Sequence, residues 1–95
     1  AIDFDGVIHD YKNPVEGKRM GLPIEGTKEA LTQLFDEGNE IIVFSVWGNQ
    51  EDVIGDWMEY YEIPYHSITN IKPNADIYLD DRAIRFEGWD NHKDI

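Results

Sequence analysis

Two aspartates near the start of the chain have a spacing that suits phosphoryl transfer. Asp3 and Asp5 stand two residues apart in a short apolar segment, and Gly6 follows at once. Residues two apart on a strand point to the same face, so both carboxylates can emerge together at the strand's end. Two like charges that close require a shared proton or a cation, and Mg²⁺ prefers such oxygen ligands. One carboxylate could then attack phosphorus while the other serves as general acid and base.

Three further polar features could complete such a site. Asp80 and Asp81 directly follow an apolar stretch, and we expect only one of them to contact a metal, because neighbours on a strand face opposite ways. Ser45 ends the apolar run 41–44, where its hydroxyl could bind a phosphoryl oxygen; a simple turn serine is the alternative. Lys72 could neutralise the transferred phosphoryl oxygens, although an ordinary surface lysine fits the sequence as well.

The elements that would position these residues alternate between strands and helices. Apolar runs predict strands over 1–5, 40–45, 63–68 and 75–80, an edge piece at 86–89, and a loop or small hairpin over 7–23. Helical periodicity predicts helices over 27–37, capped by Thr27 and Gly38, and over 49–61, capped by Asn49. This alternation favours an α/β fold with a parallel sheet flanked by helices. Sites on such sheets lie at the carboxyl ends of the strands, where the acidic residues fall.

Length and composition narrow the class of protein and ligand. The chain has 95 residues, which suits one domain, and a net charge of −12 with no cysteine. This charge disfavours long nucleic acid as a partner, and no apolar run is long enough for a membrane span. We therefore expect a cytoplasmic protein with a small phosphorylated substrate. The chain starts inside a predicted strand, so we also expect native residues before it.

Six of the eight cations fall in two segments that could form a basic rim around the acids. The first segment carries Lys12, Lys18 and Arg19, and the second carries Lys72, Arg82 and Arg85. If the segments meet in space, they would suit a phosphorylated ligand, and those of the first segment are candidate substrate contacts. We interpret His9 as a surface residue, and Trp47 as either a stacking partner for a base or sugar or a residue packed over the sheet's end.

Taken together, the motifs resemble the haloacid dehalogenase (HAD) superfamily in type and order over essentially the whole chain. The shared elements are Asp-x-Asp-Gly on the first strand, an apolar run ending in Ser, a Lys, and paired acids after an apolar strand. Residues 72–86 resemble a group of small HAD proteins of bacteria and phages. The Asp-Asp-Arg ending is similar to that of polynucleotide 3′-phosphatases and deoxyribonucleotidases. Val7 departs from the threonine that is common at this position in the family.

The resemblance implies a single Rossmann-like HAD domain over residues 1–95. A cap domain is not expected, because the flap at about 7–23 and the segment 45–72 are both too short for one. The implied activity is Mg²⁺-dependent hydrolysis of a phosphomonoester through an aspartyl phosphate, with nucleotides and nucleic-acid ends among the candidate substrates. A catalytically silent HAD-like binding or regulatory module is the alternative.

The resemblance also implies a role for each motif residue. Asp3 would be the nucleophile and a metal ligand, and Asp5 the general acid and base that offers its backbone carbonyl to the metal. Lys72 would steady the aspartyl phosphate. Asp81 is the preferred acidic metal ligand of the last motif, with Asp80 beside it. The residues expected to bind substrate are Gly6, Ser45, Val46 and Arg82.

Overall fold

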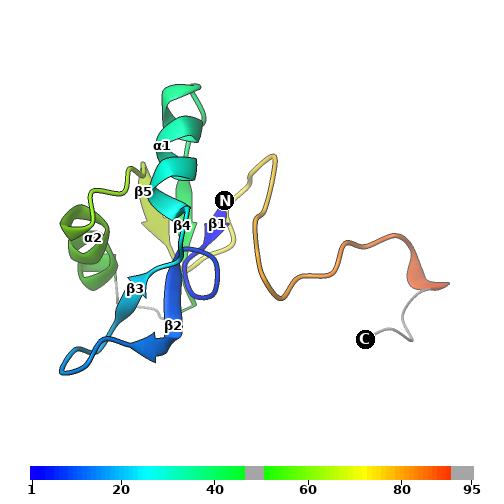
Figure 1. Cartoon of the computed structure of the whole chain (residues 1–95). Coiled ribbons are helices and arrows are strands. Elements are labelled where there is room, and N and C mark those ends of the chain that lie inside the picture. The colour runs from blue at the N-terminus through cyan, green and yellow to red at the C-terminus, as the bar shows by residue number, and fades with distance from the viewer. Residues whose placement is uncertain (47–50, 91–95) are drawn as a thin grey trace.

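The computed structural model describes residues 1–46 and 51–90, and its centre is a small parallel sheet. The strands β1 (Ile2–Asp3), β4 (Ile42–Phe44) and β5 (Ser67–Thr69) lie in the order β1-β4-β5, as Figure 1 shows. Ile2 pairs with Val43, and Val43 pairs with Ile68. The prediction of a mixed α/β fold with a parallel sheet is therefore confirmed.

The predicted fourth strand, 75–80, is reduced to one bridge on the other side of β1. Leu79 pairs with Ile2 in parallel. The Asp3 N–H donates to the Leu79 carbonyl, and the Leu79 N–H donates to the Ala1 carbonyl, both at 2.9 Å. The segment thus lies where a fourth strand would lie, and it delivers the residues that follow Leu79 to the same edge of the sheet as Asp3.

Two helices connect the strands, and their ends only partly follow the prediction. Helix α1 spans Thr27–Asp36, and helix α2 spans Glu51–Tyr60 within the described residues. The N-cap of α1 is Gly26 at φ 90°, so the prediction of Thr27 was wrong. Thr27 is instead buried as the first helical residue, whereas glycine adopts this left-handed conformation without strain. Gly38, at φ 91°, ends the helix as predicted, and its N–H donates to the Phe35 carbonyl.

Both helices pack on one face of the sheet. Leu31 of α1 and Ile54 and Met58 of α2 are buried in one cluster with Ile2 and Val43. Since Ile2 and Val43 are paired neighbours, they point to the same face, and both helices must cover that face. Each such side chain stabilises the fold by about 1.5–3 kcal/mol when fully buried. Asn49 and Trp47, for which the sequence suggested a cap and a stacking or packing role, lie outside the described residues.

The segment between β1 and α1 is a hairpin, as one of the two sequence alternatives predicted. Strand β2 (His9–Pro14) pairs with β3 (Gly21–Pro23) in antiparallel fashion, with an irregular register. The Trp57 Nε1–H donates to the Gly21 carbonyl at 3.1 Å, which ties the hairpin to α2. A Cβ on Gly21 would collide with the Asp10 carbonyl oxygen, so only glycine fits at this crossing.

The C-terminal segment leads away from the body of the molecule (Figure 1). The predicted edge strand at 86–89 is wrong: these residues form no strand, because no described strand runs beside them to pair with their backbone. Phe86 and Trp89 instead contact each other, with ring centroids 5.2 Å apart, and both side chains are largely exposed. Among the described residues, no helix is both long and apolar enough to cross a membrane.

Candidate active site

Three carboxylates from opposite ends of the chain meet at the carboxyl edge of the sheet. Asp3 ends β1, and Asp80 and Asp81 follow the Leu79 bridge beside it. One carboxylate oxygen from each of the three aspartates lies within 4.8 Å of the others. Parallel strands end at the same edge of a sheet, which explains how residues so distant in sequence meet. These three residues are called the acid cluster below.

Both Asp80 and Asp81 belong to the acid cluster, although alternation along a strand predicts that only one would face it. The reason is local: Leu79 makes a single bridge, and the chain leaves strand geometry immediately after it. Asp80 Oδ1 then accepts the backbone N–H of Arg82 at 2.8 Å, which turns the chain. In this turn the two side chains no longer have to point to opposite faces.

Burial and neighbouring negative charge both perturb the nucleophile candidate, Asp3. The pKa of Asp3 is raised from 3.8 to about 6, chiefly because the carboxylate is partly buried. The neighbouring charges of Asp80, Asp81 and Asp5 raise it further, as does a hydrogen bond to Asp81. The cluster therefore favours either a bound proton or a bound cation over three bare carboxylates.

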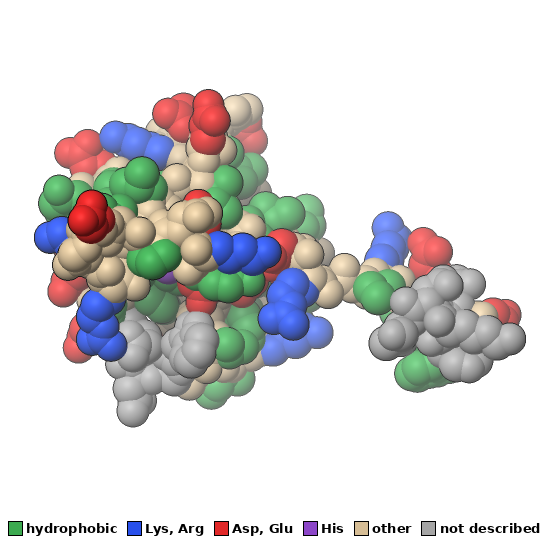
Figure 2. Space-filling view, turned by 60° about the horizontal axis from the view of Figure 1, so that its bottom comes forward, with side chains coloured by type: hydrophobic (Ala, Val, Ile, Leu, Met, Phe, Trp, Pro, Cys, Tyr) green, Lys and Arg blue, Asp and Glu red, His purple; other side chains and the backbone are tan. Residues whose placement is uncertain are grey.

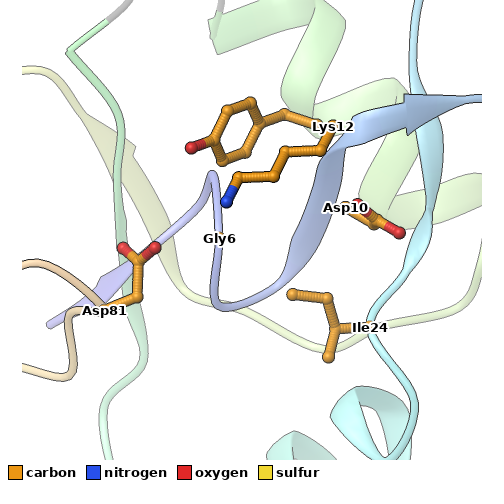
Figure 3. Close-up of a pocket in the computed structure, with 6 residues that line it drawn as sticks. Gly6, Asp10, Lys12, Ile24 and Asp81 are labelled. Atoms are coloured by element: carbon orange, nitrogen blue, oxygen red, sulfur yellow. The ribbon is translucent and has the colours of Figure 1, made fainter.

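Gly6 makes room for the acid cluster. It has φ +90°, a conformation that side-chain-bearing residues rarely adopt, and a Cβ at this position would collide with the Asp81 carboxylate. Gly6 and Asp81 also line a pocket of about 160 Å³, shown in Figure 3, together with residues of the hairpin and the segment after it. The remaining lining residues are Asp10, Tyr11, Lys12 and Ile24.

The pocket brings one of the candidate substrate contacts close to the acids. Lys12, on β2, extends its side chain toward Gly6 and the side of the pocket where Asp81 lies (Figure 3). Lys18 and Arg19 belong to the exposed turn of the hairpin. Figure 2 shows Lys and Arg side chains gathered near the point where the C-terminal segment leaves the body. A phosphorylated ligand in this pocket would therefore meet positive charge from the hairpin opposite the carboxylates.

Asp5 lies beside the cluster, but its carboxylate is directed to a residue that sequence reasoning missed. His9 is only 5% exposed, so its interpretation as a surface residue was wrong. Its Nδ1 lies 2.7 Å from Asp5 Oδ1, and its Nε2 accepts the Gly21 N–H at 2.8 Å. A tight turn causes this: the Gly6 N–H donates to the His9 carbonyl, and the His9 N–H donates to the Phe4 carbonyl. The sequence signal was a histidine four residues after Asp5, beyond a glycine turn.

The other predicted site residues differ in burial and in the contacts they make. Ser45 is buried directly after β4, at the same sheet edge as Asp3, and its N–H donates to the Thr69 carbonyl at 3.0 Å. Val46 is 73% exposed. The Lys72 ammonium lies 4.9 Å from the centroid of the Tyr78 ring. Within residues 1–46 and 51–90, neither Lys72 nor Arg82 forms an ion pair with the acid cluster.

Comparison with known proteins finds no family model, no curated protein and no solved structure that matches this chain. The function is therefore argued from the acid cluster, the pocket and the residues around them.

Proposed function

We propose that this protein is a magnesium-dependent phosphohydrolase of the HAD type, a single Rossmann-like domain without a cap, that acts on phosphomonoesters. The observation that carries the proposal is the acid cluster at the carboxyl edge of a parallel sheet. Lys12 in the adjoining pocket supports a phosphorylated ligand. A nucleotide or a nucleic-acid end is among the substrates that such an open pocket could accept.

The donor set of the acid cluster fits Mg²⁺. Three carboxylates offer only hard oxygen ligands, and their oxygens are close enough to share one ion. Burial and, after it, the neighbouring carboxylates raise the pKa of Asp3, and a divalent cation would relieve the repulsion among these charges. Asp3, Asp80 and Asp81 would hold the ion, with the Asp5 carbonyl as a further ligand. When bound, Mg²⁺ would offset the charge of the phosphoryl oxygens as they approach the carboxylates.

The proposed reaction assigns a step to each of the first two aspartates. The Asp3 carboxylate attacks phosphorus, an Asp3–phosphorus bond forms, and the ester bond to the leaving oxygen breaks while Asp5 protonates that oxygen. Water then attacks the phosphoryl group, Asp5 takes a proton from it, and Asp3 is released together with inorganic phosphate. Asp3 must be ionised to attack, and a pKa of about 6 leaves most of it ionised at pH 7.5.

The remaining motif residues would bind the substrate's phosphoryl group. Gly6, Ser45, Val46 and Arg82 are proposed to contact substrate, and Lys72 to steady the aspartyl phosphate. Lys72 would first have to leave the Tyr78 ring. That position favours the second candidate function, a catalytically silent HAD-like binding module, in which Lys72 has only a packing role.

One experiment separates the two functions. Phosphate release is measured from nucleotides, sugar phosphates and an aryl phosphate, with Mg²⁺ and with EDTA, for wild type, Asp3→Asn and Glu16→Gln. Glu16 lies in the exposed hairpin turn, so its variant controls for the loss of one negative charge. We expect release that requires Mg²⁺, is abolished in Asp3→Asn and is retained in Glu16→Gln. Release by no substrate, from wild type that binds Mg²⁺, would favour the silent module.

A further inference from the structure

We propose that His9 is a positioning residue, which holds the Asp5 carboxylate in its working orientation and links it to strand β3. The inference rests on the proposed function, because it assumes that Asp5 is the general acid and base. It starts from the two hydrogen bonds of one buried imidazole, to Asp5 Oδ1 at 2.7 Å and to the Gly21 N–H at 2.8 Å.

The hydrogen-bond partners determine which ring nitrogen carries the proton. A backbone N–H can only donate, so Nε2, which faces the Gly21 N–H, must be the acceptor. The proton of the neutral ring is then on Nδ1, where it points at Asp5 Oδ1. His9 therefore donates one hydrogen bond to the Asp5 carboxylate and accepts one from the Gly21 N–H. Residues that lie behind a catalytic group commonly orient it through such hydrogen bonds.

The surroundings of His9 restrict rotation of the ring. Its ring stacks on Phe4 with centroids 5.0 Å apart and planes 18° apart, and Trp57 contacts it edge-on at 5.4 Å. Trp57 also donates to the carbonyl of the same Gly21 whose N–H binds His9. A turn of the imidazole would break both of its hydrogen bonds and leave a buried N–H without a partner.

Through this contact the hairpin and the proton-transfer group become one unit. Strand β2 begins with His9 and also carries Lys12, which lines the pocket, and the His9 ring is bound to β3 through the Gly21 N–H. The Asp5 carboxylate, with Oδ1 bound to His9, is oriented before any substrate arrives. His9 would therefore act on proton transfer to the leaving oxygen, and not on attack by Asp3.

Three substitutions at His9 separate its two hydrogen bonds. His9→Asn places an amide N–H near the position of Nδ1 and keeps the donor to Asp5. His9→Gln places its amide near Nε2, so it keeps the acceptor for Gly21 but loses the donor. His9→Phe keeps the stack on Phe4 and loses both hydrogen bonds. The readout is kcat/KM for an alkyl phosphate, whose leaving oxygen needs a proton, and for an aryl phosphate, whose leaving oxygen hardly does.

We expect His9→Gln and His9→Phe to lower kcat/KM for the alkyl phosphate by roughly 30-fold or more, because general acid catalysis contributes roughly 10²–10⁴-fold and a misoriented Asp5 would lose part of it. The aryl phosphate should lose less than roughly 3-fold, and His9→Asn should restore most of the alkyl rate. His66 gives a control, because its Nδ1 accepts the Ile41 N–H and its ring stacks on Phe35, and the described part of the chain shows no carboxylate bound to it. His66→Gln should lower stability yet leave the alkyl-to-aryl ratio unchanged.

Equal losses for both substrates in folded His9→Gln would mark His9 as merely structural and overturn the inference while the proposed function stands. A wild type that releases no phosphate from any substrate would instead overturn both together. If the variants do not fold, the wild type still decides: long-range ¹H–¹⁵N correlation should show His9 protonated at Nδ1 and bare at Nε2. The opposite pattern would refute the proposed hydrogen bond to Asp5.

Discussion

Replacing Asp3 with asparagine should stabilise the metal-free protein at neutral pH, although it removes the proposed nucleophile. The reason is the raised pKa of Asp3, which burial and the charges of Asp80, Asp81 and Asp5 lift from 3.8 to about 6. A carboxyl that binds its proton more tightly in the folded state opposes folding once it is ionised. Asparagine has nearly the same shape and no charge, so it removes this penalty.

The pH range of the effect follows from the two pKa values. Below about pH 4 the Asp3 carboxyl is protonated in both the folded and the unfolded chain, and no penalty exists. As pH rises from there, the unfolded chain loses its proton first, and the penalty grows until the folded carboxyl has also ionised, above about pH 6. A shift of this size corresponds to about 3 kcal/mol. Because Asp3 is only half-buried, solvent screening reduces this to about 1–2 kcal/mol.

Thermal unfolding in EDTA at pH 7.5 and at pH 4.5 measures the effect. Asp3→Asn should raise Tm by roughly 5–10 °C at pH 7.5, and by much less at pH 4.5. Glu16→Gln, which removes one exposed charge, should change Tm little at either pH. With Mg²⁺ at 100 times its Kd, the wild type should gain about 2.7 kcal/mol and become the more stable of the two. A Tm for Asp3→Asn at or below that of wild type in EDTA at pH 7.5 would refute the electrostatic argument.

Two further substitutions test the pocket. Gly6→Ala places a methyl group against the Asp81 carboxylate in a left-handed backbone conformation, and we expect it to lose about 1 kcal/mol or more of stability. It should also abolish the Mg²⁺-induced rise in Tm, and an unchanged rise would contradict the proposed role of Asp81. Lys12→Ala should raise KM for phosphomonoesters by roughly 3- to 10-fold, with less effect at high salt. Lys18→Ala, in the exposed hairpin turn, is its control, and equal effects of the two would argue against a specific contact by Lys12.

The sequence predicted the parts of the fold that depend on local pattern and burial. The helix over 27–37 is found at Thr27–Asp36, because its apolar spacing buries Leu31 and its glycine at position 38 ends it. The apolar run 40–45 forms the central strand β4, where neighbours on both sides bury Val43 completely. Helical spacing likewise predicted the second helix, and its Ile54 and Met58 are buried in the core.

The expected parallel arrangement of the strands predicts which residues of the acid cluster share a sheet edge, but not how their side chains are oriented. That Asp3 and the Asp80–Asp81 pair share one sheet edge follows from a parallel arrangement in which the last segment lies beside β1. That both Asp80 and Asp81 face the cluster does not follow from it. Their orientation depends on the turn that the Arg82 N–H closes onto Asp80, which is a hydrogen bond that no periodicity encodes.

His9 shows most clearly why residue type and spacing are insufficient near a site. A lone histidine suggests a surface residue, yet here two local and two distant features bury it. The local ones are the Phe4 ring and the return of the chain at Gly6, and the distant ones are the Gly21 N–H and the Trp57 ring. The hairpin brings Gly21 back to His9. The packing of α2 against the hairpin then brings Trp57 into contact with both His9 and Gly21. The same contacts that hide His9 from sequence reasoning make it fit to hold Asp5, because a group that orients a carboxylate must itself be immobile.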